Sequence, residues 1–311
     1  REKPSRRVVL MAGGVGGARM AVGLRDALPP EALTIVVNVG DDDCFHGLRV
    51  CPDIDTVLYT LSGQVDPKNA WGIAGDSRRA LDVLKRLGAP STWMTLGDAD
   101  LGLHLYRTTR LARGATLTEV TKEIAKGFGV TACVLPVTES AVSTRIRTDD
   151  GELRFQEWFV KHRCAPRVRG LRFDGADDAA PSAEVLQTLH RADLIVFAPS
   201  NPWLSILPML RLGGIENALR ASTARKVAVS PLIGGRAVKG PLAELMQQLM
   251  VPPGNSGIGR FYEGLIDGIV IDADDEADVA GLESTGLRVL CAPTRIATAE
   301  AARELAARLI A

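Results

Sequence analysis

The stretch that decides the fold is VVLMAGGVGGAR, residues 8–19 of this 311-residue chain. An apolar run, Val8–Met11, leads into four glycines within five residues, and a helix-like stretch, Ala18–Leu28, follows. A second run, Leu33–Asn38, is rich in β-branched residues and is closed by Gly40. Strand, glycine loop, helix and strand in this order open a doubly wound α/β fold. We therefore predict a Rossmann-like, mainly parallel sheet.

The pattern changes after Leu61, where helical periods replace strands. Three helices are expected there, at Ser77–Leu87, Leu101–Leu111 and Leu117–Phe128. We predict a nucleotide-binding domain made of residues 1–61 and 131–311, interrupted by a helical insertion at 62–130.

The α/β pattern returns in the second half of the chain. Strands are expected at Ala132–Pro136, Leu194–Phe197, Lys226–Val229, Gly268–Ile271 and Arg288–Cys291. Two further strands, Ser143–Thr148 and Leu153–Val160, are joined by a hairpin-type turn at Asp149-Asp150-Gly151. A closing helix is expected at Thr298–Ile310.

Composition excludes several classes of protein. Lys and Arg number 37, as do Asp and Glu, and this balance argues against a protein that holds nucleic acid or an anionic membrane by charge. No apolar run reaches the roughly 18 residues that a membrane-spanning helix needs. The five cysteines form no C-x-x-C pair, so neither a disulfide framework nor a zinc site is favoured. We expect a cytoplasmic protein.

The glycine loop lies between a strand and a helix, where backbone N–H groups can hold a phosphate. Gly14 and Gly16 begin a G-x-G-x-x-G pattern, but Arg19 takes the third glycine's place, and no Lys-Ser/Thr follows Gly17 as a Walker loop requires. The alternative is a tight turn without a ligand. Arg19 is either a phosphate donor or a surface residue of the helix.

Two aspartates, Asp53 and Asp55, flank one residue at the start of a predicted helix. Their oxygens suit a hard divalent cation, because Mg²⁺ is commonly held by one or two carboxylates together with substrate phosphates. The alternative is that one caps the helix while the other favours its dipole.

Polar side chains also follow several predicted strands. Asn38 ends the second strand, and Asp41 and Asp42 come next, where a cation, basic partners or solvent must offset their repulsion. A solvated acidic loop is the alternative. Thr95–Asp100 forms a second acidic loop.

Ser200-Asn201 and Ser230 follow two later strands. Loops at these strand ends bind ligands in open α/β sheets. Hydroxyl and amide groups there suit phosphate, ribose or base contacts, and ordinary capping is the alternative.

Taken in order, these segments resemble the CofD/FbiA family of 2-phospho-L-lactate transferases, which act in biosynthesis of the deazaflavin coenzyme F-420. The resemblance covers nearly the whole chain. The segments that carry it are AGGVGGAR (12–19), VNVGDD (37–42), CPDIDTVLYTL (51–61), WGI (71–73), LGD (96–98), FQEW (155–158), PSNP (199–202) and VSP (229–231).

The resemblance implies a reaction. The donor is a GDP-activated phospho-acid, and the acceptor is Fo, a deazaflavin with a ribityl chain. The terminal ribityl hydroxyl attacks the phosphorus that carries the acid, and GMP leaves. Mg²⁺ is the implied cofactor. Asp53 and Asp55 match the family's Pro-Asp-x-Asp-Thr motif at the metal and the deazaflavin.

These inferences give the expected site. Asp53 and Asp55 are the predicted catalytic and metal-binding residues. The predicted substrate-binding residues are Gly13, Gly14, Gly16, Gly17, Arg19, Asn38, Asp41, Asp42, Asp55, Thr95, Asp98, Ser200, Asn201 and Ser230.

Four positions depart from the family pattern, and two of them, Gly102 and Leu103, replace small and hydroxyl residues that are common before the matching His104. Ala99 stands where an arginine is common, and Thr95 stands where some members carry a basic residue at the deazaflavin site. The sequence therefore leaves open whether the donor carries lactate, enolpyruvate or glycerate. It also leaves open which aspartate, if either, is the general base.

Two other functions stay open, and so does the oligomeric state. A sugar-nucleotide-binding regulatory protein would share the glycine loop, although the Pro-Asp-Ile-Asp-Thr segment argues against it. An NAD-dependent dehydrogenase is disfavoured by Arg19. The resemblance and the apolar stretch Trp203–Leu207 indicate a homodimer, unless that stretch is a buried helix.

Overall fold

A seven-stranded sheet forms the centre of the computed structural model, which describes residues 6–238 and 240–311. All its strand pairs are parallel, in the order β14-β13-β10-β9-β1-β2-β5. The strands are β1 (Val8–Ala12), β2 (Leu33–Val37), β5 (Cys133–Pro136), β9 (Leu194–Phe197), β10 (Arg225–Val229), β13 (Gly268–Ile271) and β14 (Arg288–Cys291). The predicted α/β class and parallel sheet are confirmed.

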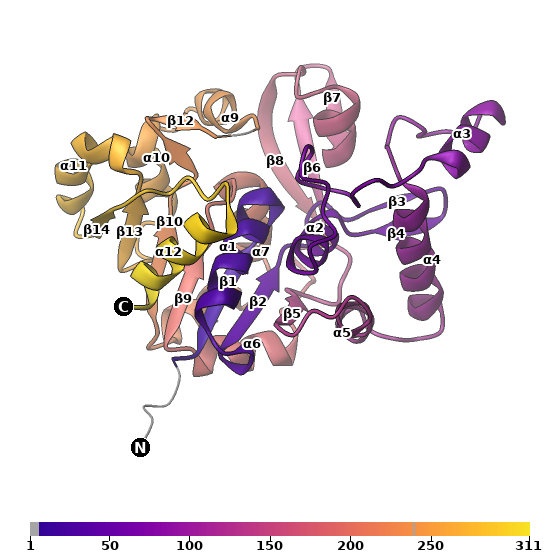
Figure 1. The fold of residues 1–311 in the computed structure, drawn as a ribbon. Coiled ribbons are helices and arrows are strands. Elements are labelled where there is room, and N and C mark those ends of the chain that lie inside the picture. Colours follow the sequence, from indigo (N-terminus) through magenta and orange to yellow (C-terminus); the bar gives the residue numbers. More distant parts are fainter. Residues whose placement is uncertain (1–5, 239) are drawn as a thin grey trace.

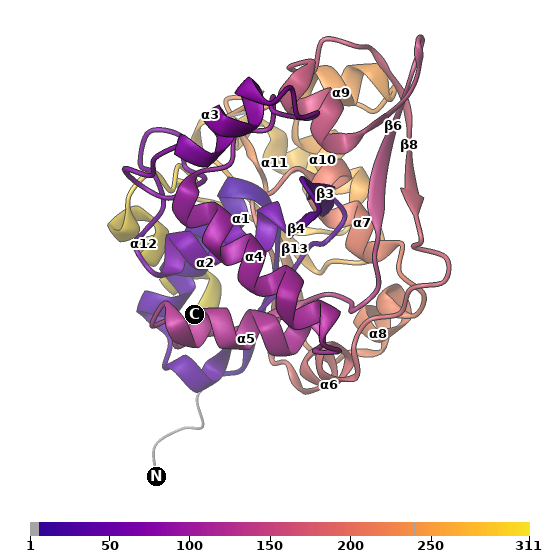
Figure 2. The same cartoon turned by 90° about the vertical axis from the view of Figure 1, so that its right-hand side faces the viewer.

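Helices cover both faces of this sheet (Figure 2). On one face, α1 (Gly14–Ala27) packs against α12 (Ala299–Ile310); a Cβ on Gly23 would lie 2.2 Å from the Ala302 carbonyl oxygen, so the approach requires glycine. The opposite face carries α6 (Ala183–Arg191) and α8 (Ile215–Ala221). Shorter helices are α7 (Leu207–Leu210), α9 (Leu242–Gln248), α10 (Gly254–Phe261) and α11 (Val279–Glu283). No helix of the described residues is long and apolar enough to span a bilayer.

The predicted helices of the insertion lie together beside the β5 edge of the sheet (Figure 1). They are α3 (Arg79–Arg86), α4 (Asp98–Ala112) and α5 (Leu117–Gly127), and they follow α2 (Pro52–Leu61). A hairpin that was not predicted, β3 (Asp43–Phe45) and β4 (Leu48–Val50), joins them through a small core of Phe45, Val50 and Leu96.

A second, antiparallel sheet stands above the first. It contains β6 (Ser143–Thr148), β7 (Gly151–Arg154) and β8 (Val168–Asp174). The hairpin is confirmed, but the predicted strand Leu153–Val160 is wrong beyond Arg154. There the chain turns into a π-helix at Glu157–Lys161, which buries Trp158 and stacks Phe155 on Phe159 with ring centroids 5.4 Å apart.

The order of the strands sets the place of the site. From β1 the chain proceeds to β2 and β5 on one side, whereas β9, β10, β13 and β14 extend from the other side of β1. Open α/β sheets bind ligands at such a switch point, outside the carboxyl ends of the strands. Gly13 follows β1 and Pro199 follows β9 at this point.

One surface prediction is wrong. Trp203, Leu204 and Ile206 are buried within the chain, so this stretch does not offer an apolar face to a second copy. The homodimer stays a prediction that rests on the family resemblance alone.

Two further strands form a short hairpin after the carboxyl end of β10. They are β11 (Leu232–Ile233) and β12 (Arg236–Ala237), and Asp275 accepts a hydrogen bond from the Gly235 N–H. This contact holds the hairpin turn against the segment that follows β13.

Candidate active site

A cavity of about 750 Å³ opens at the carboxyl ends of β1 and β9 and extends to the insertion. Many residues predicted from the sequence line it, and they come from segments far apart in the chain. These residues are Gly13, Gly14, Gly16, Arg19, Asp41, Asp53, Asp55, Thr95, Ser200, Asn201 and Ser230. The remaining predicted residues, Gly17, Asn38, Asp42 and Asp98, are not among the residues that line it.

The glycine loop is itself the first turn of α1, which begins at Gly14 rather than at Ala18. A Cβ on Gly16 would lie 2.0 Å from the Pro199 carbonyl oxygen, and a Cβ on Gly17 would lie 3.2 Å from Ser200 Oγ. Ser200 Oγ in turn donates to the Gly13 carbonyl at 2.7 Å. The glycines therefore let the helix N-terminus and the Ser200 loop approach each other at the cavity wall, where N–H groups suit an anion.

Asp53 is the centre of a buried polar cluster. Its Oδ1 accepts the Gly14 N–H at 2.7 Å, and its Oδ2 accepts from Asn38 Nδ2 at 3.0 Å. The same Asn38 amide also donates to Asp41 Oδ1 at 3.3 Å, so it bridges the two carboxylates. Burial raises the pKa of Asp53 to about 6, although both hydrogen bonds oppose the shift.

Asp41 and Asp42 add further negative charge to this cluster. Burial and the neighbouring charges of Asp53 and Asp42 raise the pKa of Asp41 well above its ordinary value. Burial raises the pKa of Asp42 to about 6, against the opposing charge of Arg49, whose guanidinium lies 3.0 Å from Asp42 Oδ2. The other Asp42 oxygen, Oδ1, is buried with no hydrogen-bond partner.

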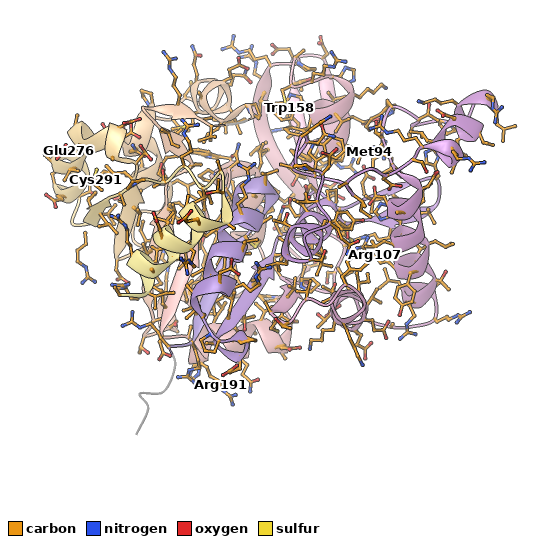
Figure 3. All side chains as sticks on the ribbon, in the orientation of Figure 1. Met94, Arg107, Trp158, Arg191, Glu276 and Cys291 are labelled. Atoms are coloured by element: carbon orange, nitrogen blue, oxygen red, sulfur yellow. The ribbon has the colours of Figure 1, made fainter. Side chains whose placement is uncertain are left out.

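Asp55 has a different environment from Asp53. The fully buried Arg107 of α4 donates to both of its oxygens, through NH2 to Oδ1 and through NH1 to Oδ2 at 3.2 Å. Figure 3 labels Arg107 on α4, and its bonds to Asp55 tie that helix to α2. Sequence reasoning missed Arg107; the available signal was its place three residues after His104, on the same face of a helix.

A fourth carboxylate, Asp100, lines the cavity on the side of the insertion. Tyr59 Oη donates to Asp100 Oδ1 at 2.5 Å, and His104 Nε2 lies 3.4 Å from the same oxygen. Burial raises the pKa of Asp100, but the contacts with His104 and Tyr59 outweigh burial and leave the pKa below its ordinary value. Sequence reasoning singled out neither Tyr59 nor His104 as a site residue.

Apolar side chains form the outer part of the cavity. Trp71, Met94 and Leu96 come from the insertion, and the stacked Phe155 and Phe159 come from the π-helical turn. Trp71 is 45% exposed and Phe159 is 40% exposed, although both are large aromatic side chains. This part of the cavity suits a flat apolar ring.

Capping, which the sequence left as an alternative for the Ser200-Asn201 loop, is present at Asn201, and Asp98, where it was not expected, also accepts N–H groups at the start of a helix. Asp98 accepts hydrogen bonds from Ser77 Oγ and from the N–H groups of Arg79 and Ala80 at the start of α3. Asn201 Oδ1 accepts the N–H groups of Trp203 and Leu204, yet Asn201 also lines the cavity. Asp98 thus stabilises the start of α3 in the insertion.

The polar cluster fits a divalent cation. Asp53 and Asp41 line the cavity and share one amide donor. Burial raises the pKa of both, and the charges of Asp53 and Asp42 raise that of Asp41 further, so a cation would stabilise the two ionised carboxylates. Mg²⁺ commonly takes one or two carboxylates together with substrate phosphates and water. Within residues 6–238 and 240–311, no group of three or more His, Cys, Asp or Glu side chains has the arrangement of a metal site.

Comparison with solved structures supports the fold. A UPF0052-family protein from Bacillus halodurans aligns with a TM-score of 0.65 at 18% identity, covering 99% of this chain and 100% of that one. At this identity the likeness shows a shared fold only.

Sequence comparison reaches further. A phosphoenolpyruvate transferase of Nocardia farcinica is 37% identical over 96% of this chain and 93% of the relative. A 2-phospho-L-lactate transferase of Methanosarcina acetivorans is 36% identical over 96% of both chains. The model of the family described as 2-phospho-L-lactate transferase CofD matches residues 8–294, which include every predicted site residue. The chain therefore belongs to the CofD family of transferases.

Proposed function

We propose that the protein transfers a phospho-acid group from its GDP-activated donor to the terminal ribityl hydroxyl of Fo, with release of GMP. The observation that carries this proposal is the single cavity that joins a helix N-terminus, a carboxylate cluster and an aromatic wall. The cavity offers groups that suit an anion, a cation and a flat ring, and the three would bind next to one another beside Asp53.

The glycine loop provides the donor's site. The N-terminus of α1 faces the cavity beside Arg19, so N–H groups and a guanidinium are available to the diphosphate. Phosphoryl transfer depends on positioning and on charge stabilisation more than on covalent chemistry by the protein. Asp53 would hold Mg²⁺ as predicted, but Asp41 would be its partner in place of the predicted Asp55, because Arg107 donates to both Asp55 oxygens. When bound, Mg²⁺ would neutralise charge on the diphosphate.

The acceptor's site follows from the apolar end of the cavity. The deazaflavin ring lies against Trp71 and Phe159, and the ribityl chain extends inward toward Asp53. Its terminal oxygen forms a bond to the phosphorus that carries the acid, the bond from that phosphorus to the GMP oxygen breaks, and the hydroxyl proton passes to a carboxylate. Asp53 suits that proton better than Asp55, because its two donors are neutral amides, whereas the charged Arg107 holds both Asp55 oxygens.

The identity of the phospho-acid stays open between lactate, enolpyruvate and glycerate. The two relatives named for different acids are 37% and 36% identical to this chain, so overall similarity does not decide between them. Incubating the protein with Fo, Mg²⁺ and an equimolar mixture of the three donors tests the proposal. We expect mass spectrometry to find one dominant phosphodiester of Fo.

Binding of the GDP moiety without GMP release would contradict the proposal and support the non-catalytic regulatory protein instead. Binding of a nicotinamide dinucleotide in the same cavity would favour the dehydrogenase. The Fo-free reaction is the control, because GMP released there reports hydrolysis of the donor rather than transfer.

A further inference from the structure

We propose that Asp100 binds the ribityl chain of the acceptor, accepting hydrogen bonds from its hydroxyls through Oδ2. This inference rests on the proposed function and assigns a residue that the predicted site did not include. Four observations support it: the orientation of the carboxylate, its fixed backbone, its charge and its place between two parts of the site.

The orientation of Asp100 comes from a hydrogen bond to one of its oxygens. Tyr59 Oη donates to Oδ1 at 2.5 Å, and the buried His104 ring packs on the same side, with Nε2 3.4 Å from that oxygen but not hydrogen-bonded to it. Oδ2 accepts no hydrogen bond from the described residues, although Asp100 lines the cavity.

The backbone of Asp100 is also held in place. Asp76 accepts the N–H groups of Ala99 at 2.9 Å and of Asp100 at 3.1 Å, which caps the first turn of α4. A Cβ on Gly97 would lie 2.0 Å from Asp76 Oδ2, so this close approach requires glycine. The carboxylate is therefore preorganised before any ligand binds, and preorganisation lowers the cost of binding.

Charge decides which ligand suits this oxygen. The Asp100 side chain is 14% exposed, and its contacts favour the ionised form. An ionised carboxylate repels the anionic donor. It has no proton to donate, so it binds groups that donate a hydrogen bond. A polyol chain offers several hydroxyl donors and no charge. The ribityl chain has this chemistry, whereas the diphosphate does not.

The position of Asp100 fits a chain that links ring to reaction centre. His104 lies between Asp100 and Asp55, with its Nδ1 3.7 Å from Asp55 Oδ2. In the other direction, Trp71 and Thr95 line both the main cavity and an adjoining cavity of about 460 Å³, as Asp100 does. A ring against Trp71 and a terminal hydroxyl near Asp53 would place the intervening hydroxyls beside Asp100.

Asp100→Asn is the variant that tests this. Asparagine keeps an acceptor for Tyr59 but presents an N–H₂ group where Oδ2 accepted. We expect the Kd for Fo by calorimetry, and the KM for Fo, to rise about 10- to 100-fold, the loss typical of a hydrogen bond to a charged group. The KM for the donor should stay unchanged. Asp82→Asn removes the same charge from exposed α3, where Asp82 contacts Lys85 at 3.8 Å, and is the matched control.

Fo analogues that lack one ribityl hydroxyl sharpen the test. Wild-type protein should bind at least one of them 10- to 100-fold more weakly than Fo, and Asp100→Asn should bind that analogue and Fo alike. The proposal is overturned if Asp100→Asn binds Fo as tightly as wild type does. It is also overturned if the variant distinguishes Fo from every analogue as strongly as wild type does. A fall in kcat without a change in affinity, which would mark a structural role, overturns it as well.

Failure of the proposed function and failure of the variant to fold can each be told apart from failure of the Asp100 proposal. If wild-type protein binds Fo but forms no product, the proposed function fails while the calorimetric comparison still decides the role of Asp100. If Asp100→Asn does not fold, Tyr59→Phe replaces it, since that change removes a donor to Oδ1 and leaves the carboxylate. A weaker affinity for Fo is then expected, and wild-type affinity overturns the proposal.

Discussion

Asp53 is buried with an asparagine and a backbone N–H as its donors, and burial raises its pKa from 3.8 to about 6. The folded protein therefore binds this proton more tightly than the unfolded chain does. The protonated Asp53 carboxyl therefore contributes its full stabilisation of the folded protein below pH 3.8, and this contribution is lost as the pH rises through about 6. The Asp53 carboxylate thus lowers the stability of the metal-free protein at neutral pH.

The first prediction uses Asp53→Asn to isolate this effect. In metal-free protein, the stability of the variant relative to wild type should rise by about 1.4 kcal/mol between pH 5 and pH 8. Thermal unfolding at several pH values measures it, and Mg²⁺ at pH 8 should stabilise wild type but not the variant. A difference that does not change with pH would contradict the prediction. The comparison cancels the shared carboxylates that lie away from Asp53, but not Asp41, because the Asp53 charge helps to raise the pKa of Asp41.

Arg107 and Asp55 give a second prediction at this scale. Arg107→Met leaves the Asp55 charge buried without its partner, which typically costs about 3–5 kcal/mol. Adding Asp55→Asn removes that charge, so the double variant should be more stable than Arg107→Met alone. Urea unfolding of the four proteins gives the coupling between the two positions. Additive losses would show that the ion pair does not connect α2 to α4.

Among the elements, α1 depends on glycine at a place where no side chain fits. Gly16→Ala places a Cβ 2.0 Å from the Pro199 carbonyl oxygen, so the helix or the Ser200 loop must move. We expect a loss of about 1–3 kcal/mol, as for other overpacked sites. Gly102→Ala in α4 is the control: no atom lies within 4 Å of its Cβ, and alanine should gain about 1 kcal/mol in a helix interior. Equal changes in the free energy of unfolding at the two positions would contradict the close packing of Gly16 against Pro199.

The elements also show what the sequence could predict. Periodicity located the strands of the parallel sheet and the helices of the insertion, because local pattern and final burial agree there. It failed at Leu153–Val160, where apolar residues continue past Arg154 but the chain turns to bury Trp158. It also missed β8, in which Arg169 and Arg172 stand three residues apart and so break the alternation expected of a strand.

At the scale of the whole molecule, the ends of the parallel strands brought the predicted loops together. Gly13, Asp41 and Ser200 meet in one cavity because each follows a strand end on the same edge of the sheet, and the first turn of α2 adds Asp53. Arg107 could not be predicted in the same way. The spacing of three residues from His104 places both side chains on one face of α4, but it does not indicate that Arg107 reaches Asp55 on α2.

The most direct test of the account is turnover at saturating Fo by wild-type protein and by Asp53→Asn, measured as GMP and phosphodiester formed. We predict that wild type forms the two products one to one. The variant should keep its fold and bind GDP but turn over at least about 100-fold more slowly, a loss of roughly 2.7 kcal/mol of transition-state stabilisation. Turnover by Asp53→Asn near the wild-type rate, or GMP release without phosphodiester in wild type, would contradict the account.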